Sequence, residues 1–170
     1  MEMEVLFEAA AAVMACVGGC IDLKTHKIPN RVTVPGMMIG LLLRILFEGA
    51  GGFLKGAAGF GIGCIPVFLW LLGGLKAGDV KLYMMTGVLG GWRFCLATEV
   101  CSLLLGGVAA FILTIKRKTG MRSLGYLWQY LQYLIFSGGR TGYEGGKESY
   151  FCFGWAIGAG ALIVFLTQRF

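Results

Sequence analysis

Long apolar runs separated by short polar connectors restrict the possible fold of this chain more than any other feature. Six such runs occur along the 170 residues, at about 5–21, 32–47, 56–74, 80–91, 94–115 and 150–168. A helix needs about 20 residues to cross a hydrocarbon core about 30 Å thick. Only 14% of the residues are charged, against about 25% in soluble domains. We therefore expect an all-α polytopic membrane protein with about six transmembrane helices, forming a single membrane-embedded domain over 1–170.

Glycine is unusually frequent, at 29 residues, while proline is rare, at 3 residues. The glycines form small-xxx-small pairs at Gly36/Gly40, Gly52/Gly56, Gly59/Gly63, Gly87/Gly91 and Gly154/Gly158. Such pairs allow helix backbones to approach each other closely in a membrane. None of the 6 cysteines belongs to a C-x-x-C pair, so the sequence predicts neither a zinc site nor a disulfide framework.

The connectors carry the positive charge of the chain, whose net charge is +6. The basic residues are spread over several connectors, which argues against a nucleic-acid partner. With six spans and the N-terminus outside, 11 of the 15 Lys and Arg fall in inside loops and three fall outside, at Lys55, Arg93 and Arg169. Because cytoplasmic loops are rich in Lys and Arg, this orientation is the expected one. The cytoplasmic loop 116–149 contains an aromatic patch at 126–133, which predicts an interfacial amphipathic segment.

Two aspartates fall on the cytoplasmic side in this topology. Asp22 ends the first span and Asp79 begins the fourth, 57 residues later. Two neighbouring carboxyls do not both ionise readily, so one keeps a proton while the other activates a water molecule for attack on a peptide carbonyl. The alternative is that each aspartate caps a helix or lies in the interface beside Lys24 or Lys81.

The residues around both aspartates resemble motifs of the type IV prepilin peptidases. The segment 22–31, DLKTHKIPNR, is similar to the stretch after the first helix of that family, with Pro29 and Asn30 in its I-P-N turn. The segment 73–82, GGLKAGDVKL, resembles the family motif G-x-G-D-x-K-L. The first glycine of that motif is replaced by Lys76. A lysine three residues before an acid either favours the ionised form of that acid, contacts the substrate or extends toward the membrane interface, and we expect the last of these.

This resemblance implies a membrane aspartyl endopeptidase in which Asp22 and Asp79 are catalytic. Gly78 would allow close backbone approach beside Asp79, and Lys81 matches the motif lysine. The implied substrates are prepilin-like membrane proteins with a short basic leader, cut at the cytoplasmic face of the cell membrane. The larger family members carry an insertion with paired C-x-x-C motifs, which is missing between the first two runs. We therefore expect no metal, no cofactor and no methyltransferase activity, with membrane lipids as the other partners.

Two further classes of function remain open from the sequence. In a small proton- or cation-coupled transporter or channel, Asp22, Asp79 and the intramembrane Glu99 would line a path across the bilayer. In a non-catalytic scaffold of a pilus-assembly machine, the two aspartates would be incidental. His26, the only histidine, is expected to be solvated or to cap a helix.

Overall fold

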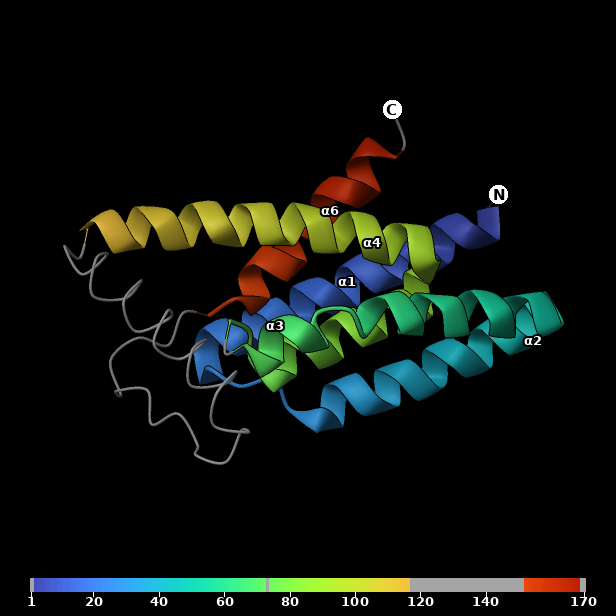
Figure 1. The fold of residues 1–170 in the computed structure, drawn as a ribbon. Helices are drawn as coiled ribbons and strands as arrows, with labels where there is room; N and C mark the ends of the chain where they lie inside the picture. Colours follow the sequence, from blue (N-terminus) through green and yellow to red (C-terminus); the bar gives the residue numbers. More distant parts are fainter. Residues whose placement is uncertain (1, 73, 117–151, 169–170) are drawn as a thin grey trace. The chain divides into compact units, whose positions relative to one another are not determined.

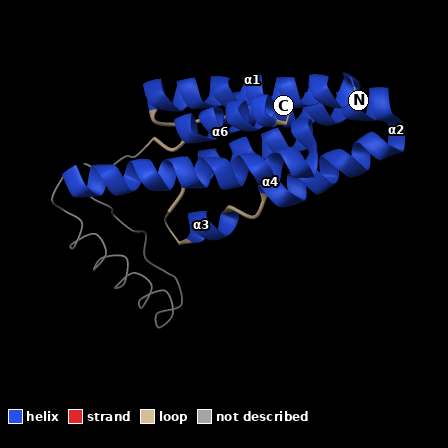
Figure 2. Cartoon of the chain, turned by 90° about the horizontal axis from the view of Figure 1, so that it is seen from above, coloured by secondary structure: helices blue, strands red, loops and turns tan. Residues whose placement is uncertain are grey.

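The computed structural model describes residues 2–72, 74–116 and 152–168, and each regular element in these ranges is a helix (Figures 1 and 2). The helices are α1 (Glu2–Thr25), α2 (Asn30–Gly63), α3 (Val67–Leu71), α4 (Ala77–Lys116) and α6 (Gly154–Thr167). The chain divides into two compact units, Met1–Gly106 with Cys152–Phe170, and Gly107–Phe151. The first unit holds both aspartates. The predicted interfacial segment at 126–133 lies outside the described residues.

The all-helical prediction is confirmed for these ranges. Three stretches are long and apolar enough to cross a bilayer, at Met3–Thr25, Asn30–Leu71 and Ala77–Ile112. The described part of the chain also contains one shorter apolar helix, Gly154–Thr167. The first helix extends beyond the predicted run 5–21 at both ends, so Asp22 lies within its last turn.

Each of the two longest helices is interrupted by one glycine. Gly49 in α2 has φ 63° and Gly91 in α4 has φ 81°, backbone angles that residues with a Cβ rarely adopt. The chain reverses at both points, as Figure 1 shows for α2. A Cβ on Gly56 would lie 2.9 Å from Cδ1 of Leu41, whereas residues 15 apart in a straight helix are separated by about 22 Å. The glycines thus divide each long helix into two antiparallel arms.

The third apolar run, 56–74, differs from its prediction as a single helical span. Helix α2 ends at Gly63, and the short helix α3 begins only at Val67. Pro66 directly precedes α3 and has no amide hydrogen to continue the ladder of α2. The segment before the second aspartate is therefore a connector that contains one short helix.

Glycine contacts hold α2 against the first arm of α4. A Cβ on Gly59 would collide with the carbonyl oxygen of Gly87, and one on Gly63 would lie 2.7 Å from Cα of Met84. Side chains at these positions would force the two backbones apart. The prediction of close, glycine-mediated helix packing is confirmed at these positions.

At the end of the unit away from the aspartates, Arg44 joins three helices. Its side chain is 2% exposed and donates to the carbonyl oxygen of Leu89 from Nε at 3.0 Å and from Nη2 at 2.7 Å. The same guanidinium pairs with Glu48 at 3.3 Å and lies 4.7 Å from the ring centre of Phe7. Because α4 breaks at Gly91, the Leu89 carbonyl lies in a last turn without helical partners, and Arg44 satisfies it.

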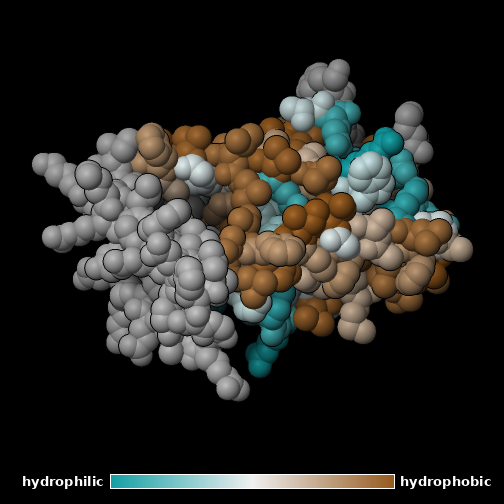
Figure 3. All heavy atoms as spheres, in the orientation of Figure 1, coloured by the Kyte–Doolittle hydropathy of each residue, from teal (hydrophilic) through white to brown (hydrophobic). Residues whose placement is uncertain are grey.

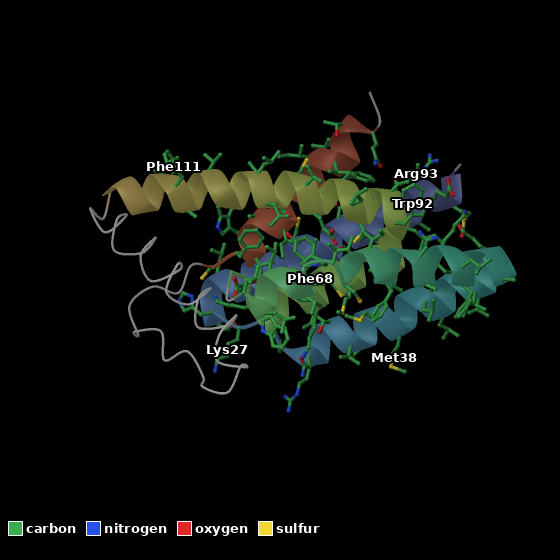
Figure 4. The ribbon with its side chains drawn as sticks, viewed as in Figure 1. Lys27, Met38, Phe68, Trp92, Arg93 and Phe111 are labelled. Atoms are coloured by element: carbon green, nitrogen blue, oxygen red, sulfur yellow. The ribbon has the colours of Figure 1, made fainter. Side chains whose placement is uncertain are left out.

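Large hydrophobic side chains cover much of the surface. Met38 is 68% exposed and Phe68 is 74% exposed, and Figure 4 shows Met38 pointing away from the helices. The face in Figure 3 is largely hydrophobic, with hydrophilic residues gathered near the N-terminal end of α1. An apolar surface of this extent suits a lipid environment better than water.

Candidate active site

Three helix ends meet around Asp22 and Asp79. Asp22 lies in the last turn of α1, Asp79 lies in the first turn of α4, and α6 begins beside Asp22 with Gly154. Both aspartates are 1% exposed, and both contact Lys76, Asp79 through the backbone N–H and Asp22 through the ammonium. The structure thus brings the two predicted residues together from sequence positions 57 residues apart.

Each carboxyl group uses one oxygen in a backbone hydrogen bond. Oδ2 of Asp22 accepts the N–H of Gly154 at 3.1 Å, and Oδ2 of Asp79 accepts the N–H of Lys76 at 3.2 Å. The Asp79 contact has the form of a helix-capping interaction, in which an acid in the first turn reaches back to the residue before the helix. Capping therefore accounts for one oxygen of Asp79.

The two remaining carboxyl oxygens differ from the first pair. Oδ1 of Asp22 and Oδ1 of Asp79 are buried, and neither accepts a hydrogen bond from another described residue. Buried polar atoms normally have hydrogen-bond partners, and exceptions are concentrated at functional sites. Their burial without a hydrogen-bond partner therefore marks these two oxygens as candidate functional atoms.

Lys76 contacts both acidic residues. Its ammonium lies 3.7 Å from Oδ1 of Asp22 and 3.4 Å from the carbonyl oxygen of His26, while its backbone N–H reaches Asp79. The expectation that Lys76 extends toward the membrane interface is wrong, because its side chain turns inward to a buried carboxylate. Lys81, which the alternative interpretation placed beside an aspartate, bonds to Asn30 instead.

The two sequence motifs also contact each other beside the aspartates. Nζ of Lys81 donates to Oδ1 of Asn30 at 2.8 Å. A Cβ on Gly78 would lie 3.2 Å from Cβ of Ile28, so the absence of a side chain allows the start of α4 to pack against the I-P-N turn. Pro29 is extended, with φ −72° and ψ 139°, and directly precedes α2.

The end of α1 is shaped by His26, which lies in the left-handed region with φ 55°. Its backbone N–H donates to the carbonyl oxygen of Asp22 at 2.8 Å, which is the αL form of a helix C-cap. Its Nδ1 lies 2.7 Å from Sγ of Cys152. His26 therefore caps a helix through its backbone and contacts the segment that leads into α6.

Glu99 lies apart from this arrangement in the second arm of α4. It is 4% exposed, and Oε1 lies 3.5 Å from Sγ of Cys95, which donates to it. Two basic side chains in the same unit have other contacts, since Arg44 pairs with Glu48 and Arg93 lies over the ring of Trp92. A local thiol contact of this kind gives Glu99 no direct part in the aspartate pair.

Sequence reasoning placed Gly154 only in a small-xxx-small pair and did not predict that its backbone N–H donates to Asp22. The residue is 132 positions away from Asp22, and nothing local in the sequence distinguishes it from the other glycines. The only available signal was its place at the start of the last apolar run.

The comparison with protein families agrees with the motifs around both aspartates. The model of the type IV leader peptidase family matches residues 9–115, which include Asp22 and Asp79. No curated protein and no solved structure matches the chain. The matched stretch covers more than half of the chain, and its helices include three that are long and apolar enough to cross a bilayer. The chain therefore belongs to the type IV leader peptidase family and is a membrane protease.

Proposed function

We propose that this protein is an aspartyl endopeptidase that removes the short basic leader from type IV prepilin-like substrates at the cytoplasmic face of the membrane. Asp22 and Asp79 are the catalytic residues of this proposal. The observation that carries it is a pair of buried carboxyl groups from distant helices, each with one oxygen that accepts no hydrogen bond within the described residues. Helix capping alone does not explain why those two oxygens are buried without a hydrogen-bond partner.

The pair acts as a unit that holds one proton between two carboxyl groups. The ionised carboxylate takes a proton from water as the water oxygen attacks the scissile carbonyl carbon. The protonated carboxyl donates its proton to the carbonyl oxygen, which gives a neutral gem-diol. The carbon–nitrogen bond then breaks, the leaving nitrogen takes up the first proton, and a diol hydroxyl returns a proton to the second carboxylate. No covalent acyl-enzyme forms, and the cycle needs no metal or cofactor.

We also propose that α2 and α4 each cross the membrane twice, which gives six spans over a single peptidase domain of residues 1–170. The reversals at Gly49 and Gly91 support this arrangement. Lys55 and Arg93, two of the basic residues assigned to the outside, both line a polar cavity with Glu4. Lys76 and Lys81 lie at the aspartate end. Figure 4 shows Lys27 at one end of the helices and Arg93 at the other, which agrees with an external N-terminus and a cytoplasmic active site.

The basic residues at the aspartate end suit a membrane surface better than a basic leader. Lys24 and Lys27 are exposed on or just after the last turn of α1, where they repel a cationic peptide and attract anionic lipid headgroups. Substrate selection in this proposal depends on the apolar helix that follows the leader. The protein acts as a peptidase without the methylation step of the larger enzymes.

Co-expression with prepilin candidates from the same genome tests the assignment. Cleavage is followed on a gel for the wild type, Asp22→Asn and Asp79→Asn, with Glu4→Gln as a matched control. Glu4 is exposed and bonds to Lys55 at the other end of the unit, so its loss should leave processing unchanged. Each Asp→Asn change should slow cleavage by about 100-fold or more, as expected when a general acid or base is lost. Cleavage at the wild-type rate by either variant rejects the catalytic pair and favours a scaffold.

A further inference from the structure

We propose that Lys76 is a positioning residue that places the negative charge of the catalytic pair on Asp22. This proposal rests on the peptidase function above and adds a division of labour between the two aspartates. The family motif has glycine at this position, so this chain supplies a cation where the motif provides no side chain.

Lys76 can distinguish the two aspartates because its backbone contacts one of them and its side chain contacts the other. The N–H of Lys76 binds Oδ2 of Asp79 at the start of α4, and this bond does not depend on the side chain. The ammonium lies 3.7 Å from Oδ1 of Asp22 and is also held by the carbonyl oxygen of His26 at 3.4 Å. A substitution of the side chain can therefore remove the charge while the contact to Asp79 remains.

The charged and titratable neighbours make the pair asymmetric. Asp22 faces the Lys76 ammonium and the N–H at the start of α6, and both contacts suit a carboxylate. Asp79 receives the neutral backbone N–H of Lys76, and among the described residues it forms no ion pair. Of the other titratable groups nearby, the Cys152 thiol bonds to His26, and the Lys81 ammonium bonds to Asn30.

This asymmetry assigns the two roles in the reaction. Asp22 is the ionised member, which takes the proton from water, and Asp79 holds the proton that passes to the carbonyl oxygen. The ammonium lies beside the carboxylate before the substrate arrives, so the charge distribution of the reactive state is already present.

The pH dependence of cleavage tests the role of the charge. Lys76→Met removes the cation, so ionisation of the pair requires a higher pH. We expect the acid limb of the pH–rate profile to move upward by about 1 unit, a modest shift for a cation at this distance because the lysine is partly exposed. On that limb the rate falls by about tenfold. Lys76→Arg should restore the wild-type profile. Lys27→Met, which loses the same charge from an exposed position at the same end, should leave it unchanged.

Two results would overturn the proposal in this assay. One is an unshifted acid limb in Lys76→Met while the wild type is active. The other is an equal loss of rate at every pH that arginine does not restore, because that result indicates a structural role only.

A double-mutant cycle on stability tests the partner of Lys76 without measuring cleavage. Lys76→Met is combined with Asp22→Asn or with Asp79→Asn, and thermal unfolding is followed at pH 8 in detergent micelles. With Asp22 present, in the Asp79→Asn background, the lysine change should lower the unfolding temperature by about 2 to 4 °C. In the Asp22→Asn background the change should have a clearly smaller effect, because only the contact of the ammonium with the His26 carbonyl oxygen is then lost. Equal effects in both backgrounds, or none in either, reject Asp22 as the partner. An inactive wild type would reject the peptidase function and leave this cycle interpretable.

Discussion

Gly154→Ala tests how closely catalysis depends on the packing of α6 against Asp22. A Cβ at position 154 would lie 2.8 Å from Cβ of Asp22 and 3.1 Å from its Oδ2. Carbon atoms in contact prefer about 3.5 to 4.0 Å, so the carboxyl group or the start of α6 must move by about 1 Å. The backbone N–H that donates to Asp22 is unchanged by the substitution, which makes displacement the main effect.

A displacement of about 1 Å in a catalytic group lowers the rate by about 100-fold. We expect this loss in cleavage of a prepilin-like substrate in isolated membranes, measured at equal amounts of folded enzyme. Gly61→Ala is the matched control, since no atom lies within 4 Å of a Cβ at that helical position. Cleavage by Gly154→Ala within threefold of the wild-type rate would refute the link between this contact and the geometry of Asp22.

Substitutions at two further positions test the packing of the helices through thermal unfolding in detergent. Gly59→Ala should destabilise the protein by about 1 to 3 kcal/mol, because the new methyl group collides with the carbonyl of Gly87 and the helices must separate; an unfolding temperature equal to that of Gly61→Ala would contradict this. Arg44→Met should cost about 2 kcal/mol, because the Leu89 carbonyl and Glu48 both lose a buried donor. Arg44→Lys should recover only part of that loss, since one ammonium cannot reproduce the two bonds to Leu89.

The helical fold followed from the sequence because hydrophobic runs long enough to cross a bilayer leave little choice of structure. The two aspartates could also be predicted from the sequence, since the expected topology placed both on one side of the membrane and each lies in a recognisable motif. Glycine spacing predicted the close approach of helix backbones, which the contact between Gly59 and Gly87 confirms.

The missed features depend on side-chain direction or on distant partners. Lys76 was expected to extend toward the interface, but a buried carboxylate lies within its reach. A single sequence does not reveal which direction the Lys76 side chain takes, because that side chain has several rotatable bonds. The third apolar run appeared continuous, yet Pro66 separates α2 from α3. The extra length of α1 and α4 beyond their apolar runs comes from polar residues that continue the helix, among them Asp22 and Asp79.

The bond between Gly154 and Asp22 has a consequence for how the enzyme is made. Ribosomes add about 5 to 20 residues per second, so Gly154 is synthesised roughly 7 to 26 s after Asp22, from which it is 132 residues away. Asp79 is synthesised during that interval, while Asp22 still lacks its donor from α6. Because α6 follows both aspartates in the chain, a nascent or truncated chain that stops before α6 carries both acids without the contact from Gly154. The Asp22 carboxyl thus gains this backbone donor only after α6 has been made.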